Sequence, residues 1–222
     1  SFFRSILIAS LFALQSAPGQ SEKDDTRQWV KSRIRVIVDN DFGGDPDGLF
    51  QLAHQLLSPS VDVRGIIGSH HYPNGFYGSP GSSEHSVEMA KRLLEVMELT
   101  GKVPVLQGAN ERLKDPTSPA DSEAVRFIIQ ESMRNDVSTP LHVVCGAGLT
   151  DLASACLIEP KIAERIRLIW IGGPEYEGQA QPPPGKPRIE YNLGIDVKAS
   201  QVVFNQSTLP IWQIPRDRKS VV

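Results

Sequence analysis

The sequence predicts an α/β fold in which an open, mostly parallel β-sheet carries helices on both faces. Two observations lead to this prediction. Short apolar runs of strand length alternate along the chain with longer segments whose apolar residues recur at helical spacing. No linker in the 222 residues is rich enough in turn residues to divide them into two domains. Because parallel strands need a crossover segment between them, this alternation implies a mostly parallel sheet.

The first half of the predicted fold contains three strands and two helices. An apolar run at 34–38 predicts a buried strand, and residues 47–57 predict the helix that follows it. Residues 61–67 predict a second strand. Residues 85–99 predict a long helix, because their apolar side chains recur at helical spacing. A glycine turn then precedes a short strand at 103–106.

The second half continues the alternation, with the apolar runs LHVVC and IRLIWI as its clearest strands. We predict, in order, a helix at 122–133, a strand at 141–145, a helix at 149–157, a strand at 166–171, a helix at 197–205 and a strand at 209–214. Two long loops, 73–83 and 179–188, follow strand ends. Open parallel sheets bind their ligands at such ends, so both loops are candidate site segments.

The composition narrows the class of protein. Hydrophobic residues make up 40% of the chain and charged residues 22%, as in ordinary globular proteins. A formal net charge of −3 argues against a nucleic-acid partner held by bulk electrostatics. The chain has two cysteines, Cys145 and Cys156. We predict that both are small buried hydrophobic residues rather than a disulfide or a nucleophile pair.

The N-terminal residues have the layout of a secretory signal. Arg4 precedes an apolar run at 6–14, which is followed by small residues and then by charged ones. The run is too short to span a bilayer. We therefore predict a signal peptide at 1–19, a linker at 20–32 and a single domain at 33–222, with the mature protein periplasmic or secreted and not bound to a membrane. The alternative is a buried N-terminal helix.

Four aspartates follow the first predicted strand within nine positions: Asp39, Asp41, Asp45 and Asp47. Adjacent carboxylates repel each other unless a proton or a cation compensates their charge. Asp45 or Asp47 alone could cap the next helix, but one cap needs only one aspartate. A hard cation such as calcium or magnesium fits the whole cluster better. An EF-hand does not, because His54 occupies the position of its bidentate glutamate.

Two kinds of enzyme have an acid-rich strand end of this type. One is a phosphatase of the haloacid dehalogenase type, with an aspartyl nucleophile at Asp39, a second acid at Asp41 and a magnesium ion. Gly43 stands where that pattern has a hydroxyl, and no convincing phosphate-binding lysine follows. The other is a nucleoside hydrolase.

Five segments, in the same order, resemble the nucleoside hydrolase family, in particular its inosine/uridine-preferring type. Together they cover residues 33 to about 214. The segments are VDNDFGGDPDGLFQLA, VRGIIGSHH, KVPVLQGA, HVVCGAGLTDLASACLIEPKIAERIRLIWIGG and EYNLGIDVKASQVVFNQS.

The resemblance implies calcium-dependent hydrolysis of the N-glycosidic bond of ribonucleosides or related glycosides. In this family calcium chelates the ribose diol and a water molecule, and an aspartate takes a proton from that water. Asp41 matches that aspartate, which is also a metal ligand. Asp47 matches an acid that binds metal or ribose, and the backbone carbonyl of Gly146 matches a further metal ligand.

The resemblance also assigns sugar-binding residues. Asn192 matches the family's sugar-binding asparagine, Glu190 beside it grips the 5′ end, and Gln179 stands where another amide contacts ribose. Taken alone, Asn192 could be a turn residue and Glu190 a solvated charge. The pair His70 and His71 is expected to be exposed in a loop.

Two departures from the family pattern stand out. Asp47 is followed by Gly48 where the family has a second acid, so Asp45 is the candidate replacement as a metal ligand. A sugar-binding relative without turnover is therefore an alternative function. The chain also stops before the family's last metal aspartate and nearby histidine, and residues 217–222 read as foreign sequence on a truncated, inactive chain. Members of the family are often dimers or tetramers, so the resemblance allows a homo-oligomer, although this sequence shows no interface signal.

Overall fold

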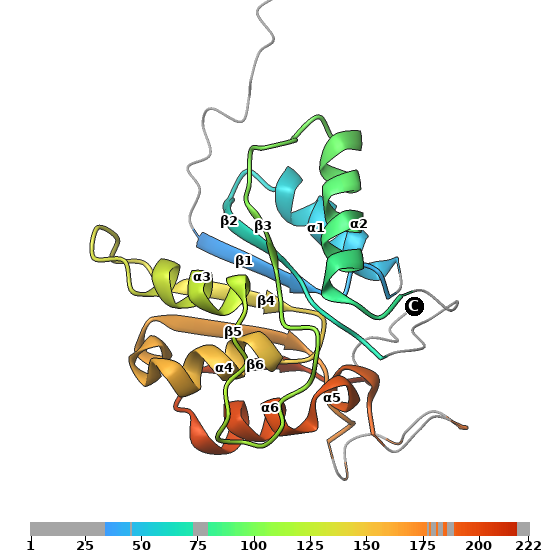
Figure 1. The fold of residues 1–222 in the computed structure, drawn as a ribbon, viewed down its shortest axis with the longest axis vertical. Helices are drawn as coiled ribbons and strands as arrows, with labels where there is room; N and C mark the ends of the chain where they lie inside the picture. The colour runs from blue at the N-terminus through green and yellow to red at the C-terminus, as the bar shows by residue number, and fades with distance from the viewer. Residues whose placement is uncertain are drawn as a thin grey trace, which may run out of the picture.

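The computed structural model describes residues 34–44, 46–72, 80–176, 178, 181, 184–185 and 189–216. These residues form one six-stranded sheet with helices on both faces (Figure 1), as predicted. The predicted signal peptide and linker lie outside the described residues, as do Asp45 and Gln179.

All five strand pairings in the sheet are parallel. The strands lie side by side in the order β3-β2-β1-β4-β5-β6. Their bounds are β1 Ile34–Asn40, β2 Val61–Gly68, β3 Val105–Gln107, β4 Leu141–Cys145, β5 Ile166–Ile171 and β6 Ile211–Ile214.

The helices are close to the predicted ones, with one addition and one division. They are α1 Asp47–Leu57, α2 Ser83–Val96, α3 Glu123–Ser132, α4 Thr150–Ile158, α5 Tyr191–Ile195 and α6 Val197–Gln201, with a 3₁₀ turn Pro160–Glu164 after α4. The predicted helix at 197–205 is divided: α6 passes into a π-helical turn, Val202–Gln206. The sequence patterns did not predict α5.

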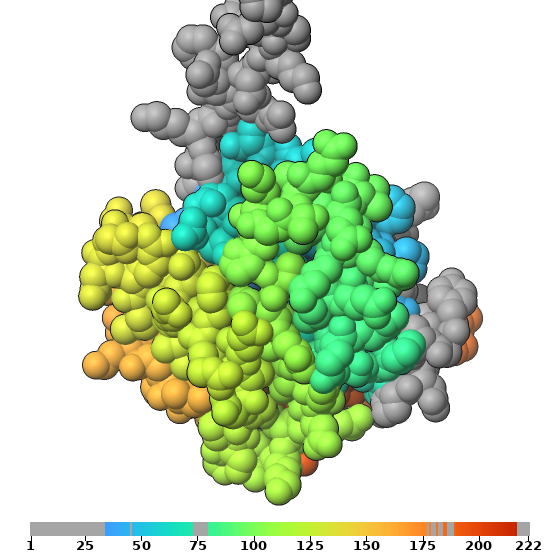
Figure 2. Space-filling model, turned by 45° about the horizontal axis from the view of Figure 1, so that its top comes forward, coloured from blue at the N-terminus to red at the C-terminus, as the bar shows by residue number. Residues whose placement is uncertain are grey.

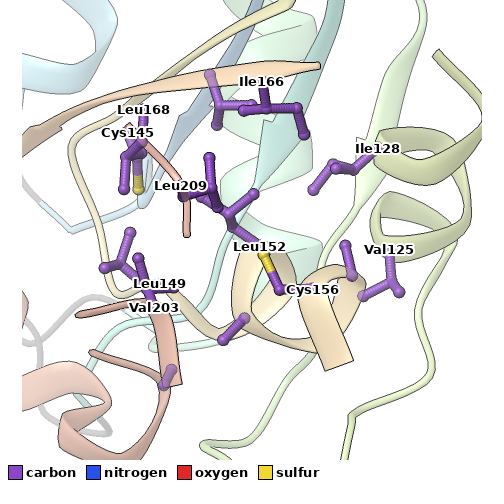
Figure 3. Close-up of a cluster of buried hydrophobic side chains, with 14 of the residues drawn as sticks. Val125, Ile128, Cys145, Leu149, Leu152, Cys156, Ile166, Leu168, Val203 and Leu209 are labelled. Atoms are coloured by element: carbon purple, nitrogen blue, oxygen red, sulfur yellow. The ribbon is translucent and has the colours of Figure 1, made fainter. Parts of the chain in front are cut away.

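Alternating side chains of the central strands feed two hydrophobic clusters. Ile37 of β1 points into the larger cluster, against α3, α4 and α6, and its neighbours Val36 and Val38 point into the smaller one, against α1 and α2. Figure 3 shows the larger cluster, in which side chains of β4, β5, α3 and α4 converge. This is the two-faced burial expected of a parallel sheet.

The segment that follows β3 runs over the molecular surface. Figure 2 shows α2, this segment and α3 side by side on one face, in green to yellow. Cys145 and Cys156 are buried free thiols, which confirms that prediction. Among the described residues, no helix has both the length and the apolar character needed to cross a bilayer.

The strand order creates a switch point between β1 and β4. From β1 the chain proceeds to β2 and β3 on one side, and the later strands β5 and β6 are added beyond β4 on the other. In such sheets a crevice forms outside the carboxyl ends of the two central strands. The two ends meet here, because the N–H of Gly146, just after β4, donates to the carbonyl of Asp39 at 2.9 Å.

Candidate active site

Asp39 and Asp41 lie at the carboxyl end of β1, on the switch-point crevice. Asp39 is fully buried, and its Oδ1 accepts a 2.5 Å hydrogen bond from Ser69 Oγ. Its Oδ2 has no hydrogen-bond partner among the residues that the structure describes. Burial, followed by the charge of Asp151, raises the pKa of Asp39 to about 8. Asp41 is also buried, with 6% of its surface exposed.

The turn after β1 brings the backbone close to the Asp41 carboxylate. The N–H of Gly44 donates to the Asp41 carbonyl at 2.6 Å, and a Cβ on Gly44 would stand 3.0 Å from Asp41 Oδ2. Ser86 of α2 holds the turn from outside: it accepts from the N–H of Gly43 at 3.3 Å and donates to the carbonyl of Ser69 at 2.7 Å. A side chain at residue 44 would therefore crowd the carboxylate.

A third carboxylate, Asp151 of α4, belongs to the same buried region. It accepts from Ser122 Oγ at 2.6 Å and from the N–H of Ala109 at 3.0 Å, and burial nevertheless raises its pKa. Burial and then the charges of Asp39, Asp41 and Asp151 raise the pKa of the Cys145 thiol. The sequence reasoning missed Asp151, because an aspartate near the start of a helix is normally a surface residue.

Asp47 is the first residue of α1 and is exposed. The N-cap of α1 is Pro46, and no side chain caps the helix by a hydrogen bond, so Asp47 does not serve as its cap. The structure thus places Asp41 and Gly146 together beside the carboxyl ends of β1 and β4, with Asp47 one turn away at the start of the next helix.

Glu190 and Asn192 both connect α5 to the end of β5. Glu190 is buried, and its Oε2 accepts from the N–H of Gly173 at 2.8 Å and from that of Leu193 at 3.0 Å, which caps α5. The Nδ2 of Asn192 donates to the carbonyl of Ile171 at 2.6 Å. Glu190 is thus not a solvated charge, and Asn192 lies in a helix rather than a turn.

The expectation that His70 and His71 are exposed is wrong, since both are buried. The His70 Nδ1 lies 2.9 Å from the carbonyl of Ala109, so this nitrogen carries the proton. Burial lowers the pKa of His70. The histidines are buried because the loop after β2 folds inward, against the segment after β3, instead of running over the surface.

The same loop reaches across the crevice to α5. The rings of Tyr72 and Tyr191 pack edge to face with 5.1 Å between their centroids. A Cβ at Gly194 would overlap the Tyr72 hydroxyl, so a side chain there would displace the tyrosine ring. Because β1 and β4 lie between β2 and β5 in the sheet, this contact spans the carboxyl ends of the two central strands. It places two aromatic rings at the carboxyl edge of the sheet.

The donor set fits a hard divalent cation. Asp39, Asp41 and Gly146 lie at the carboxyl ends of β1 and β4, and Asp39 Oδ2 is a buried carboxylate oxygen with no hydrogen-bond partner among the described residues. Within the described ranges, no three His, Cys, Asp or Glu side chains form a ready metal cluster. Asp45 lies outside those ranges.

Comparison with known proteins agrees with this geometry. The model of the family described as "Inosine-uridine preferring nucleoside hydrolase" matches residues 36–220. The chain belongs to this nucleoside hydrolase family. The resemblance noted in the sequence is thereby confirmed, and so is the α/β fold.

Curated nucleoside hydrolases match part of the chain. The inosine-uridine preferring nucleoside hydrolase of Crithidia fasciculata is 35% identical over 95 residues, which are 42% of this chain and 27% of that protein. The enzyme of the same name from Leishmania major is 36% identical over 85 residues, or 38% of this chain and 25% of that protein.

Solved structures share the fold over a longer stretch. A purine-preferring ribonucleoside hydrolase from Gardnerella vaginalis has a TM-score of 0.62 and 23% identity, covering 82% of this chain and 61% of its own. An inosine-uridine preferring nucleoside hydrolase from Bacillus anthracis has a TM-score of 0.57 and 18% identity, covering 83% and 65%. The chain thus spans less than two thirds of the relatives that it matches.

Proposed function

We propose that this nucleoside hydrolase cleaves the N-glycosidic bond of ribonucleosides or related glycosides with the help of a bound calcium ion. The observation that carries the proposal is the cluster of buried carboxylates at the switch point of the sheet. Asp39 and Asp41 are within the crevice where such sheets bind ligands, and burial together with the charge of Asp151 disfavours the ionised form of Asp39, an effect that a bound cation would compensate. Family membership supplies the reaction class.

In this proposal Asp41 has two tasks: it binds the ion, and its carboxylate accepts a proton from the attacking water. Gly146 adds its backbone carbonyl, and Asp47, with Asp45 as the further acid, completes the protein oxygens around the ion. When bound, calcium would polarise the water and chelate the ribose diol. The burial of Asp41 supports the first task, because a desolvated carboxylate interacts more strongly with a cation.

Glu190 and Asn192, with Gln179, are proposed to hold the ribose. Their placement supports this role in part, since Glu190 and Asn192 lie beside each other at the end of β5, on the ligand-binding edge. Both are also held by backbone groups, which fixes their positions before substrate arrives.

We also propose that the protein is exported to a periplasm or secreted, on the strength of Arg4 and the apolar run at 6–14. N-terminal sequencing of protein recovered from the periplasm or medium tests this. A new N-terminus after about residue 19 supports export, and an uncut chain retained in the cytoplasm contradicts it.

The functional test is release of reducing sugar from inosine, uridine and adenosine, with calcium and after chelation. It uses both the 222-residue chain and the product of its complete gene. Chelator-sensitive release supports the proposal. Calcium-dependent binding of ribose without release favours the non-catalytic alternative, which Gly48 motivates. Release of phosphate from phosphomonoesters, with no sugar released, favours a phosphatase.

A further inference from the structure

The residue between the two strand-end aspartates, Asn40, has its side chain held on both sides. It is 3% exposed. Its Oδ1 accepts the N–H of Asp41 at 2.8 Å, and its Nδ2 donates to Gln51 Oε1 of α1 at 2.6 Å. Because the Asp41 N–H must face an acceptor, only one orientation of the amide satisfies both bonds. The amide therefore joins the end of β1 to α1.

Two glycines make room for this amide. A Cβ on Gly48 would stand 2.8 Å from Asn40 Cγ, and a Cβ on Gly146 would overlap Asn40 Nδ2. Both approaches are closer than any normal contact between a Cβ and another heavy atom. The amide thus occupies the space that side chains at residues 48 and 146 would need, on both of its flanks.

Gln51 carries the connection to a second proposed ligand. It lies four residues after Asp47 in α1, so both project from the same side of the helix. A hydrogen bond that fixes Gln51 against Asn40 also fixes the rotation of α1 about its axis, and with it the place of Asp47. The Asn40 amide is therefore hydrogen-bonded to the backbone N–H of Asp41 and to Gln51, which lies on the same face of α1 as Asp47.

We propose that Asn40 is a positioning residue for the metal-binding acids, and that Gly48 is an adaptation to Asn40 rather than a lost ligand. The inference rests on the proposed function for the bound metal. The packing of Asn40 against Gly48 does not depend on that function. Residue 48 cannot carry a carboxylate while Asn40 holds this place. Gly48, which stands where the family has its second acid, is then the consequence of using the Asn40 amide to position Asp47.

The first test is a double-mutant cycle on the metal-free chain, with Asn40→Ala, Gly48→Ala and the double variant. Gly48→Ala is expected to lower Tm by roughly 5 °C in the wild-type background, because its Cβ collides with the amide. In the Asn40→Ala background the same change is expected to raise Tm, since alanine is favoured over glycine in a helix. An equal change in Tm on Gly48→Ala in both backgrounds would contradict the claim that the Asn40 amide fills the space beside Gly48.

The second test follows hydrogen exchange at the Asp41 amide, also without metal. Asn40→Ala removes the acceptor of this N–H, so its exchange should accelerate at least tenfold relative to amides in the middle of β4. Unchanged exchange would overturn the positioning role. Both tests decide the inference even if the chain binds no calcium, which would count against the proposed function alone.

The third test connects Asn40 to the metal. Calcium affinity is expected to fall about tenfold to a hundredfold in Asn40→Ala and in Gln51→Leu, as for other residues that orient metal ligands. Gln51→Glu keeps an acceptor for Asn40 Nδ2 and should retain affinity. Asn205→Ala, at an exposed position, is the control. A lowered Tm with unchanged calcium affinity in Asn40→Ala would mean that Asn40 only packs.

Discussion

At the scale of single residues, burial decides which side chains of this protein can ionise. The crevice gathers acids, a thiol and histidines within the protein rather than at its surface. Burial raises the pKa of Asp39 and of Cys145 and lowers that of His70, in each case toward the neutral form. A bound cation would lower the pKa of these carboxyl groups and so favour their ionised form.

The two thiols should be chemically inert in the folded protein. Burial raises the pKa of Cys156 to about 12 and raises that of Cys145 as well, so little thiolate exists at neutral pH. We expect no reaction of either cysteine with a thiol reagent in native buffer and reaction of both in denaturant, measured by absorbance. Rapid labelling of the native protein would contradict this.

His70 should make the fold sensitive to mild acid. Its pKa is lowered in the folded state, mainly by burial, whereas the unfolded chain takes up a proton near pH 6.5. Its contribution to stability is therefore complete above about pH 6.5 and is lost as the pH falls. The decrease in Tm from pH 7.5 to 5.5 should be smaller in His70→Asn, whose amide can still donate to the Ala109 carbonyl.

His54→Gln is the matched control for this measurement. His54 is exposed on α1, so its replacement removes a histidine without disturbing a buried site. An equal decrease in wild type and His70→Asn would show that His70 is not the group responsible.

At the scale of elements, the five-residue helix α5 depends on a cap. Such a short helix is not stable by itself, and its position comes from Glu190, whose carboxylate accepts the N–H groups of Gly173 and Leu193. Glu190 thus joins the end of β5 to α5. A residue assigned to ribose by resemblance has a structural task as well.

Glu190→Ala should therefore cost about 1–3 kcal/mol of unfolding free energy, because it leaves buried N–H groups without their acceptor. Urea denaturation measures this. Glu190→Gln keeps an acceptor oxygen and should cost less, and Glu95→Ala, on the exposed face of α2, should change stability by less than about 0.5 kcal/mol. A stable Glu190→Ala variant would contradict the capping role.

The sequence patterns predicted the sheet well because its strands are apolar runs. The limits of β4, β5 and α1 agree residue for residue with the prediction, since Cys145, Ile171 and Leu57 each end an apolar or helical pattern. The pattern failed at α5, which is too short for helical periodicity and exists through the Glu190 cap. It also failed at His70, since only the fold of the neighbouring segments shows that the loop turns inward.

The candidate site was predictable where its residues are neighbours in the sequence and not where they meet only in space. Asp39 lies in β1 and Asp41 directly follows that strand at the same parity, so their common location could be expected from spacing alone. Asn40 gave no signal, because its role comes from Gly48 and Gly146, which are adjacent to it in space only. No sequence signal indicated Asp151 either, because its side chain comes from α4 and meets Asp39 only in the folded protein.

At the scale of the whole molecule, the two edges of the sheet are built for different purposes. The carboxyl edge gathers buried acids whose ionisation is disfavoured by burial. Toward the amino edge, the buried Arg35 of β1 pairs with Glu131 of α3 at 2.7 Å, and Arg64 joins at 2.9 Å. Burial raises the pKa of Glu131, but the two arginines more than offset this and lower it overall. A partly buried ion-pair network thus lies toward one edge and the candidate site at the other.

This division predicts separable effects. Arg35→Met should cost roughly 3 kcal/mol in urea denaturation, because it breaks a buried ion pair. Calcium affinity should change by less than about twofold in the same variant, since no ion pair between residues that the structure describes joins the two edges. A large loss of calcium affinity in folded Arg35→Met would show that the edges are coupled.

The most direct test of the account is a calorimetric titration of the metal-free protein with calcium, in wild type and in Asp41→Asn. Asp121→Asn, at an exposed site, serves as the control. We predict one calcium ion per chain in wild type and in the control, and affinity at least about a hundredfold weaker in Asp41→Asn. Calcium binding that survives the loss of Asp41, or no binding by the wild-type protein, would contradict the claim that the crowded aspartates are there to hold a cation.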